Sequence, residues 1–216
     1  MMNETLTPEV LLRAYQAGIF PMSDGRHDPD IYWVDPRKRG VMPLDGFHIS
    51  RSLAKQMRKG EYAVTADQHF DAVLQQCAAR KDTWISTRIE KLYQQLFSSG
   101  FAHSIEVSTP DGTLFGGVYG VAIRGVFFGE SMFSSQTGGS KIALAYLVDR
   151  LRMGGFTLFD TQFITPHLES LGGVEISRKT YHDLLAHGLS QDADFWASGP
   201  GSPAADQVLQ RNAQTS

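Results

Sequence analysis

The 216-residue chain has a single cysteine, Cys77, and one thiol excludes a framework of intrachain disulfide bonds. Long apolar runs are also missing, since the run from Ile142 to Val148 is far shorter than the roughly 20 residues that span a bilayer. The first ten residues lack the basic and apolar regions of a secretory leader. We therefore expect a soluble, cytoplasmic protein without a membrane partner.

The histidines, seven in all, do not form a metal-binding signature. His27 lies near Asp28 and Asp30 in the segment DGRHDPD, but the glycine and proline there indicate a solvent loop. No second pair of ligands follows at a useful spacing. We predict no metal ion and no other cofactor.

The net charge of −3 gives no sign of a general affinity for polyanions. One segment, from Pro36 to Gly60, is nevertheless strongly basic and contains a single acid, Asp45. Its basic residues are Arg37, Lys38, Arg39, Arg51, Lys55, Arg58 and Lys59. A solvated surface accounts for such a run, and a selective contact with RNA phosphates would require the same residues. Charge alone does not choose between these interpretations.

Helix and strand signals predict an α+β protein. Thr7 and Pro8 begin a helix that ends at Gly18, and Ser50 and Gly60 bound a basic helix. After Gly100, β-rich runs with two turn signals predict three antiparallel strands, followed by a helix over 140–152 and alternating strands and helices. We expect a small mixed N-terminal domain over residues 1–62, a mixed sheet covered by helices over 63–189, and a loose polar tail over 190–216.

An acidic residue, Glu130, interrupts the apolar segment VFFGESMFS. A buried charge is costly unless it is paired, so Glu130 needs either a structural partner or a functional role. Further along, Asp160 and Gln162 stand two apart in FDTQF and should share one face of a strand. That face is ordinarily the solvent side. If the strand is covered on both faces, however, these groups and Glu130 could share one polar cleft.

Two other features have both a structural and a functional interpretation. The turn Gln136–Gly139 opens a helix as the pyrophosphate-binding turn of coenzyme-A-dependent N-acetyltransferases does, although two glycines also simply permit a tight turn. The aromatic residues Trp33, Trp84 and Tyr93 would usually be core. Near a basic segment, they could instead stack on a nucleobase of an unpaired RNA end.

Ten short segments between about residue 11 and about residue 189 resemble the leucyl/phenylalanyl-tRNA–protein transferase family in order and approximate spacing. The segments are AGIFPM, YWVDPR, FHISRSL, TWIS, AHSIEV, GGVYGVA, FFGESMFS, SKIAL, DTQF and HLESLGGVEISR. The resemblance implies a small N-terminal domain followed by an acetyltransferase-like domain. It also implies an enzyme that transfers Leu or Phe, and less well Met, from charged tRNA to proteins that begin with Arg or Lys. The modified proteins would then enter the N-degron route of degradation.

The resemblance also implies a role for particular residues. Gln162 would accept a hydrogen bond from the attacking α-amine, Asp160 would orient and polarise Gln162, and Glu130 would help to hold the polar reactants. Trp33, Trp84 and Tyr93 would hold the 3′-terminal adenosine. The pocket for the amino-acid side chain would be lined by Val118, Phe127, Leu147 and Phe159. The seven basic residues would contact phosphates of the tRNA.

Three positions depart from the commoner pattern of the family: Met22, Gly139 and Thr165. Two other functions stay open from the residues alone, a coenzyme-A-dependent N-acyltransferase that uses the Gln136–Gly139 turn and a non-catalytic module that binds tRNA ends. We expect the chain to act as a monomer. The sequence does not rank Leu, Phe and Met as donors.

Overall fold

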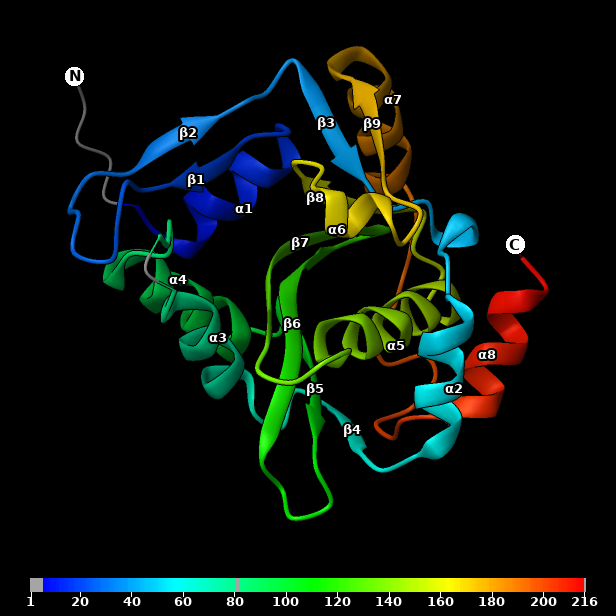
Figure 1. The fold of residues 1–216 in the computed structure, drawn as a ribbon. Coiled ribbons are helices and arrows are strands. Elements are labelled where there is room, and N and C mark those ends of the chain that lie inside the picture. Colours follow the sequence, from blue (N-terminus) through cyan, green and yellow to red (C-terminus); the bar gives the residue numbers. More distant parts are fainter. Residues whose placement is uncertain (1–5, 81, 216) are drawn as a thin grey trace.

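A seven-stranded sheet forms the centre of the computed structural model, which describes residues 6–80 and 82–215 (Figure 1). The ends of the expected N-terminal domain and tail, residues 1–5 and 216, lie outside the described residues. The strand order is β4-β5-β6-β7-β8-β3-β9. The strands are β3 Lys38–Val41, β4 Ala63–Ala66, β5 Ala102–Ser108, β6 Leu114–Ile123, β7 Val126–Ser134, β8 Leu158–Gln162 and β9 Val174–Ser177.

Strands β5, β6 and β7 are the three antiparallel strands predicted after Gly100, so that prediction is confirmed. β7 and β8 pair in parallel and are joined by helix α5, Gly139–Met153. A parallel pair needs such a crossover, because its two strands enter the sheet from the same end. The predicted α+β fold class is confirmed, because a mixed sheet is covered by helices on both faces.

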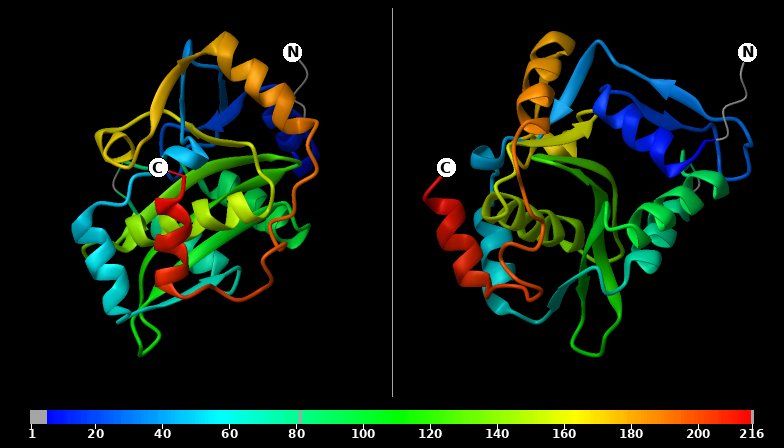
Figure 2. Two further views of the ribbon diagram at one scale, coloured as in Figure 1. Left: turned by 90° about the vertical axis from the view of Figure 1, so that its right-hand side faces the viewer. Right: turned by 180° about the vertical axis from the view of Figure 1, so that it is seen from behind.

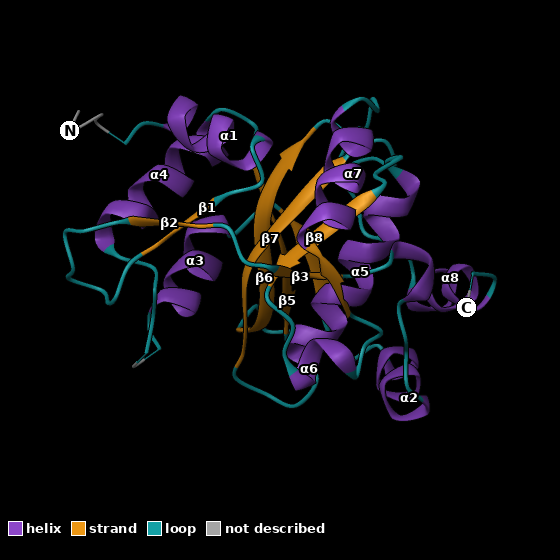
Figure 3. Ribbon diagram, turned by 90° about the horizontal axis from the view of Figure 1, so that it is seen from above, coloured by secondary structure: helices purple, strands orange, loops and turns teal. Residues whose placement is uncertain are grey.

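Helices on the two faces of the sheet belong to two separate hydrophobic clusters (Figures 2 and 3). One cluster contains buried residues of α2 (Arg51–Lys59), α5 and α8 (Ala205–Ala213). The other contains buried residues of α1 (Pro8–Gln16), α3 (Phe70–Ala78), α4 (Thr87–Ser98) and α7 (Arg178–Leu189). The short helices η1, Leu44–Gly46, and α6, Pro166–Glu169, lie in connections. None of the helices in this described part of the chain is long and apolar enough to cross a membrane.

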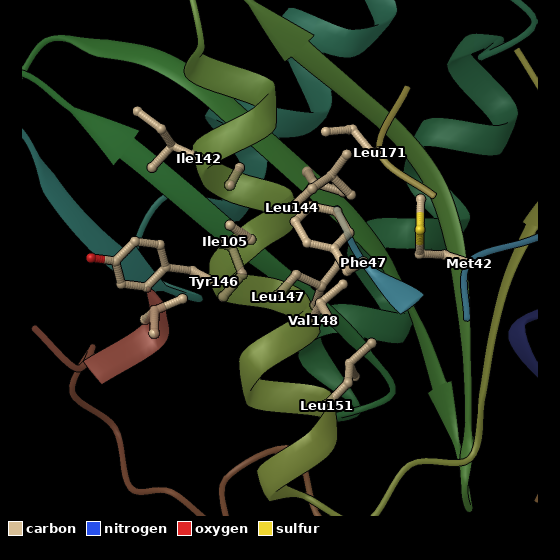
Figure 4. Packing of buried hydrophobic residues seen from close by; sticks show 14 of the residues in the cluster. Met42, Phe47, Ile105, Ile142, Leu144, Tyr146, Leu147, Val148, Leu151 and Leu171 are labelled. Carbon is tan, nitrogen blue, oxygen red and sulfur yellow. The ribbon is translucent and has the colours of Figure 1, made fainter. Parts of the chain in front are cut away.

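Helix α5 is buried on more than one side. Its buried residues include Leu144, Leu147 and Val148, and also Ile142 and Tyr146, so they do not form a single narrow stripe. Figure 4 shows the helix crossing the sheet with Phe47 beside it, and both Phe47 and Met42 belong to the same hydrophobic cluster as the helix. A helix that is buried in this way is a rigid support for β7 and β8, the two strands that it joins.

Helix α2 begins and ends where the sequence predicted. The Ser50 hydroxyl accepts a hydrogen bond from the Leu53 amide at 3.2 Å, and Gly60 adopts the left-handed conformation with φ 65°. The helix nevertheless packs with α5 and α8 rather than with the N-terminal elements. Strand β3 likewise lies between β8 and β9 in the large sheet, and it does not pair with the small β1–β2 sheet formed by Phe20–Met22 and Tyr32–Val34. Residues 38–59, expected within the N-terminal domain, thus form β3 of the large sheet and α2, because local patterns in a sequence do not show which distant strands pair.

The segment expected to be a loose tail is ordered instead. Its helix α8 packs on α2 and α5, and Arg211 forms a two-bond ion pair with Asp149 of α5 at 2.7 Å. Arg150 is buried and donates hydrogen bonds to the carbonyl oxygens of Phe195, Gly199 and Gly201. This prediction was wrong because the stabilising partners of the tail lie on α5, 45 to 62 residues earlier in the chain.

Candidate active site

A cavity of about 190 Å³ opens where β7 and β8 separate. The two strands pair only from Val126 to Phe128 and from Leu158 to Asp160. Beyond that point they diverge, so their next residues face each other across an open space. The cavity is lined by Arg80, Trp84, Val118, Gly129, Glu130, Ser131, Met132, Leu144, Phe159, Thr161, Gln162, Phe163, Thr165 and Leu168.

A β-bulge directs Glu130 towards this cavity. On the neighbouring strand β6, Tyr119 pairs with Ser131 and Gly120 pairs with Gly129, which leaves Glu130 as the extra residue of β7. A bulge of this kind bends a strand and changes the direction of the extra side chain. Glu130 is buried, with 8% of its surface exposed, yet it lines the cavity.

The carboxylate of Glu130 is the centre of a buried hydrogen-bond network. The Tyr15 hydroxyl lies 2.6 Å from Oε1, the Tyr93 hydroxyl 2.5 Å from Oε2, and the two hydroxyls 2.7 Å from each other. The Gln162 side-chain amide donates to Oε1 at 3.0 Å. Burial raises the pKa of Glu130 to about 7, even though the hydrogen bonds from Tyr15, Tyr93 and Gln162 favour the ionised form.

The network has fewer hydroxyl protons than oxygen-to-oxygen contacts. Three oxygen-to-oxygen contacts join the two phenols and the carboxylate, but the phenols together carry only two protons. Burial raises the pKa values of Tyr15 and Tyr93 well above 10, so neither phenol ionises near neutral pH. The third contact is satisfied when Glu130 itself is protonated. Its pKa near 7 makes both protonation states accessible at neutral pH.

The raised pKa of Glu130 predicts how stability changes with pH. Between about pH 4.5 and about pH 7 the folded carboxyl holds a proton that the unfolded chain has released, so raising the pH through this window destabilises the fold. The contribution is about 3 kcal/mol. Urea unfolding at about pH 5 and about pH 7.5 should show a smaller loss of unfolding free energy for Glu130→Gln than for the parent. An equal loss in both proteins would contradict the assignment.

Gln162 adopts a backbone conformation that is uncommon for a residue with a side chain. Its φ is 64°, at the point where β8 ends and the chain turns over Gly40 of β3. A Cβ atom at Gly40 would lie 2.5 Å from the backbone carbon of Phe163, so only glycine fits beneath this turn. Because Nε2 of Gln162 donates to Glu130, its amide oxygen stays available as an acceptor in the cavity.

Asp160 is fully buried and does not line the cavity. It receives two hydrogen bonds from Arg39, at 2.9 and 2.7 Å, one from the Tyr181 hydroxyl at 2.8 Å and one from the Gln162 backbone amide at 2.8 Å. Asp160 therefore acts on Gln162 through the main chain. Its charge is matched by Arg39, whose pKa is raised. Burial is the largest single effect and opposes the charged guanidinium, but the hydrogen bonds with Asp160 and the attraction of nearby negative charge, chiefly that of Asp160, together outweigh it.

Two family models match the chain, and both carry the description leucyl/phenylalanyl-tRNA protein transferase. The N-terminal model matches residues 4–37, and the larger model matches residues 41–186. The chain belongs to this family.

A transferase of the family from Cereibacter sphaeroides is 55% identical over 216 residues, which is 100% of both chains. A second, from Ruegeria sp., is 55% identical over 212 residues and covers 98% of this chain and 100% of the relative. Among solved structures, FemX matches with a TM-score of 0.50 and 12% identity, over 82% of this chain and 70% of that one. At that identity the likeness to FemX shows the fold alone.

The aromatic residues expected to hold adenosine lie in three different settings. Trp84 is half-buried and lines the cavity beside Glu130 and Gln162. Tyr93 is completely buried, so its ring offers no stacking surface, and its hydroxyl binds Glu130 instead. Trp33 is 40% exposed and lines a separate hollow against α1. Of these three aromatic residues, only Trp84 lines the cavity together with Glu130 and Gln162.

Half of the expected side-chain pocket lines the cavity. Val118 and Phe159 lie on its wall, whereas Phe127 and Leu147 are buried in the core behind it. Leu144, one helical turn before Leu147 on α5, takes the position on the wall (Figure 4). Residues three apart share one face of a helix, so the sequence pattern does not show which of these two leucines reaches the space between β7 and β8.

The basic residues expected to contact phosphates divide between two elements. Arg51, Lys55, Arg58 and Lys59 are exposed on α2, and Arg37 and Lys38 are exposed at the start of β3. Arg39, in contrast, is 1% exposed and donates hydrogen bonds to Asp160 and to the Gly18 carbonyl oxygen. It therefore has no surface to offer to RNA. Arg39 stands two residues before the apolar Val41, so the two side chains share one face of β3. That spacing was the signal in the sequence that could have placed Arg39 inward.

Sequence reasoning missed several other residues of the site. Tyr15 lies on the buried face of α1, and Tyr181 on that of α7, so each was indistinguishable from an ordinary core tyrosine. Thr161 lines the cavity, and its hydroxyl is buried without a hydrogen-bond partner among the described residues. Arg80 lies at the end of α3, outside the basic segment that drew attention in the sequence.

Proposed function

We propose that this chain transfers Leu or Phe, and less well Met, from charged tRNA to the α-amino group of proteins that begin with Arg or Lys. The observation that carries the proposal is the cavity between β7 and β8, which brings Trp84, Glu130 and Gln162 to one place. The names of the relatives support an aminoacyl-tRNA donor and a protein acceptor. The transfer would take place in the cytoplasm and would mark the acceptor for N-degron degradation.

The reaction is the aminolysis of an ester. The α-amine attacks the aminoacyl carbonyl carbon, a C–N bond forms, the ester C–O bond breaks, and a proton passes from the nitrogen to the released ribose oxygen. The ester is already activated, so the enzyme mainly positions the reactants and manages this proton. The Gln162 amide oxygen accepts a hydrogen bond from the amine, while Arg39 and Asp160 hold the Gln162 backbone in place.

The lining of the cavity matches the proposed donors in its chemistry. Its walls include the apolar side chains of Val118, Met132, Leu144 and Phe159. Large apolar side chains such as those of Leu, Phe and Met gain free energy when they are buried against such a surface. Glu130 lies beside this wall, and its ionised form would attract an acceptor with a cationic first residue. Exposed Arg51 and Lys55 of α2 would contact the acceptor stem of the tRNA.

The coenzyme-A alternative is disfavoured by the turn on which it depends. In the Gln136–Gly139 turn, the Gly139 amide donates to the Gln136 carbonyl oxygen at 3.2 Å and the Ser140 amide donates to the Ser134 hydroxyl at 3.3 Å. Two of the amides that could bind a pyrophosphate here are thus already satisfied within the protein. The alternative predicts saturable binding of acetyl-coenzyme A and no requirement for tRNA.

The first test measures transfer of radiolabelled Leu, and separately Phe, from purified charged tRNA to a peptide that begins with Arg. A peptide that begins with Ala serves as the control. Label on the Arg peptide alone would support the proposed reaction and rank the two donors. If charged tRNA binds but neither peptide is labelled, the chain is a module that binds tRNA ends.

Replacing Trp84 with alanine should weaken binding of charged tRNA about tenfold or more, because stacking of a base on an aromatic ring is lost. The rate of transfer at saturating donor should change little, since Trp84 makes no contact with the Glu130 carboxylate or with Gln162 among the described hydrogen bonds. Measuring KM and kcat separately for the donor tests this division. A fall in kcat with an unchanged KM would refute it.

A further inference from the structure

Arg80 is the only cationic side chain among the described residues that line the cavity. It follows the last turn of α3 and is exposed to solvent. Its Nη2 atom donates to the Ser131 hydroxyl at 2.7 Å and to the Met132 carbonyl oxygen at 2.5 Å. Both acceptors lie on β7 directly after Glu130, so the guanidinium is attached to the wall that carries the polar site.

These two bonds orient the guanidinium but leave most of its donors unused. Both hydrogens of Nη2 are engaged, whereas no oxygen of the described residues accepts a hydrogen bond from Nη1 or Nε. The buried Cys77 thiol also interacts with the guanidinium, but it brings no negative charge, because burial raises its pKa. No carboxylate of the described residues forms an ion pair with Arg80 either. An arginine with a fixed plane, unused donors and an unmatched charge is well suited to bind an oxyanion through its planar fork.

The neighbours of Arg80 indicate which oxyanion fits. Trp84 follows four residues later and lines the same cavity, while Gln162 marks the place of the ester. In a charged tRNA the base, the ester and one phosphate belong to a single nucleotide, because the phosphate is attached to the 5′ side of the ribose that carries the amino acid. The cationic first residue of an acceptor would be repelled by Arg80, which leaves the donor as its ligand.

We propose that Arg80 binds the phosphate on the 5′ side of the terminal nucleoside of the donor. The inference rests on the proposed function and adds a phosphate subsite to it. Arg80 would act on binding of the donor and not on the chemical step, since it makes no contact with Gln162 or the Glu130 carboxylate. Stacking on Trp84 and the bond to the phosphate would together fix the position of the ribose.

The test compares two unreactive donor analogues, phenylalanyl-adenosine with an amide in place of the ester, with and without a 5′-phosphate. Calorimetry measures their binding to the parent protein, to Arg80→Gln and to Arg80→Lys. We expect the parent to bind the phosphorylated analogue about tenfold more tightly, since charge-assisted bonds are the strong ones. Arg80→Gln should bind both analogues equally, with unchanged affinity for the analogue that lacks the phosphate. Arg80→Lys should keep part of the preference because it retains the charge without the fork.

Arg88→Gln is the matched control, because Arg88 is an exposed arginine on α4 that does not line the cavity. This variant should keep the full preference for the phosphorylated analogue. A preference that persists in Arg80→Gln, or that is absent from the parent, would overturn the phosphate subsite and leave the proposed function intact. If neither analogue binds the parent, the proposed function fails together with the subsite.

Discussion

Replacing Gln162 with methionine is expected to slow transfer by about 10²- to 10³-fold, which is typical of removing one well-placed hydrogen-bonding group from a reaction site. Methionine keeps the length and volume of the side chain but offers no amide oxygen to the attacking amine. It also removes the donor to Glu130. Binding of charged tRNA should change by no more than about twofold, because base stacking and phosphate contacts are untouched. Single-turnover rates and donor affinity, measured separately, check this result.

Gln162→Asn provides a control for the backbone of this residue. Asparagine tolerates a positive φ better than most residues, so it should fit the conformation with φ 64° that Gln162 adopts. Its shorter side chain cannot reach both Glu130 and the amine, so we expect a slow enzyme with normal folding stability. A variant with Met at this position that transfers at the parental rate would remove Gln162 from the reaction.

Replacing Asp160 with alanine is expected to lower the free energy of unfolding by about 3–5 kcal/mol. The change leaves the buried guanidinium of Arg39 without its partner, between the rings of Phe20 and Tyr181 at 4.5 and 4.3 Å. The backbone amide of Gln162 and the hydroxyl of Tyr181 also lose the carboxylate that accepts their hydrogen bonds. For a chain of this length the melting temperature should fall by roughly 10 °C. Thermal and urea unfolding measure the loss, and transfer activity should disappear with it.

Two further variants separate the effect of a buried pair from that of any ion pair. Asp183→Ala breaks the exposed Lys179–Asp183 pair and should cost less than about 1 kcal/mol. The double variant Arg39→Met/Asp160→Leu removes both buried charges and should regain part of the stability, because no unmatched charge remains. Without the backbone bond to Gln162 it should stay slow in transfer. If Asp160→Ala costs no more than Asp183→Ala, the buried pair does not support this site.

The places where helices begin and end could be predicted from the sequence because the signals are local. Thr7, Ser50 and Ser86 each accept a hydrogen bond from an amide in the first turn of the following helix. Such caps join residues only two or three positions apart, so they can be recognised in the sequence without knowledge of the fold. The turns that join β5, β6 and β7 were predictable for the same reason.

The polar residues of the candidate site were also predictable, although their arrangement was not. Glu130 in an apolar strand, and Asp160 and Gln162 two residues apart in FDTQF, indicated the polar side chains of the site. The sequence suggested that all three would share one cleft, whereas only Glu130 and Gln162 line it and Asp160 lies beneath, bound to Arg39. A bulge in each of the two strands changes the direction in which their side chains point. Bulges follow from how strands pair, so alternation within one strand does not reveal them.

By itself, then, the sequence determined the helices, the three-stranded meander and the identity of the polar groups, because these depend on interactions between residues close together in the chain. Only the tertiary structure decided that Arg39 is buried, that Tyr15 and Tyr93 bind Glu130, and that Leu144 lines the cavity. Arg39 and Asp160 are 121 residues apart, and Tyr15 and Glu130 are 115 apart. The first pair forms only when β3 takes its place beside β8 in the sheet, and the second only when α1 packs against β7.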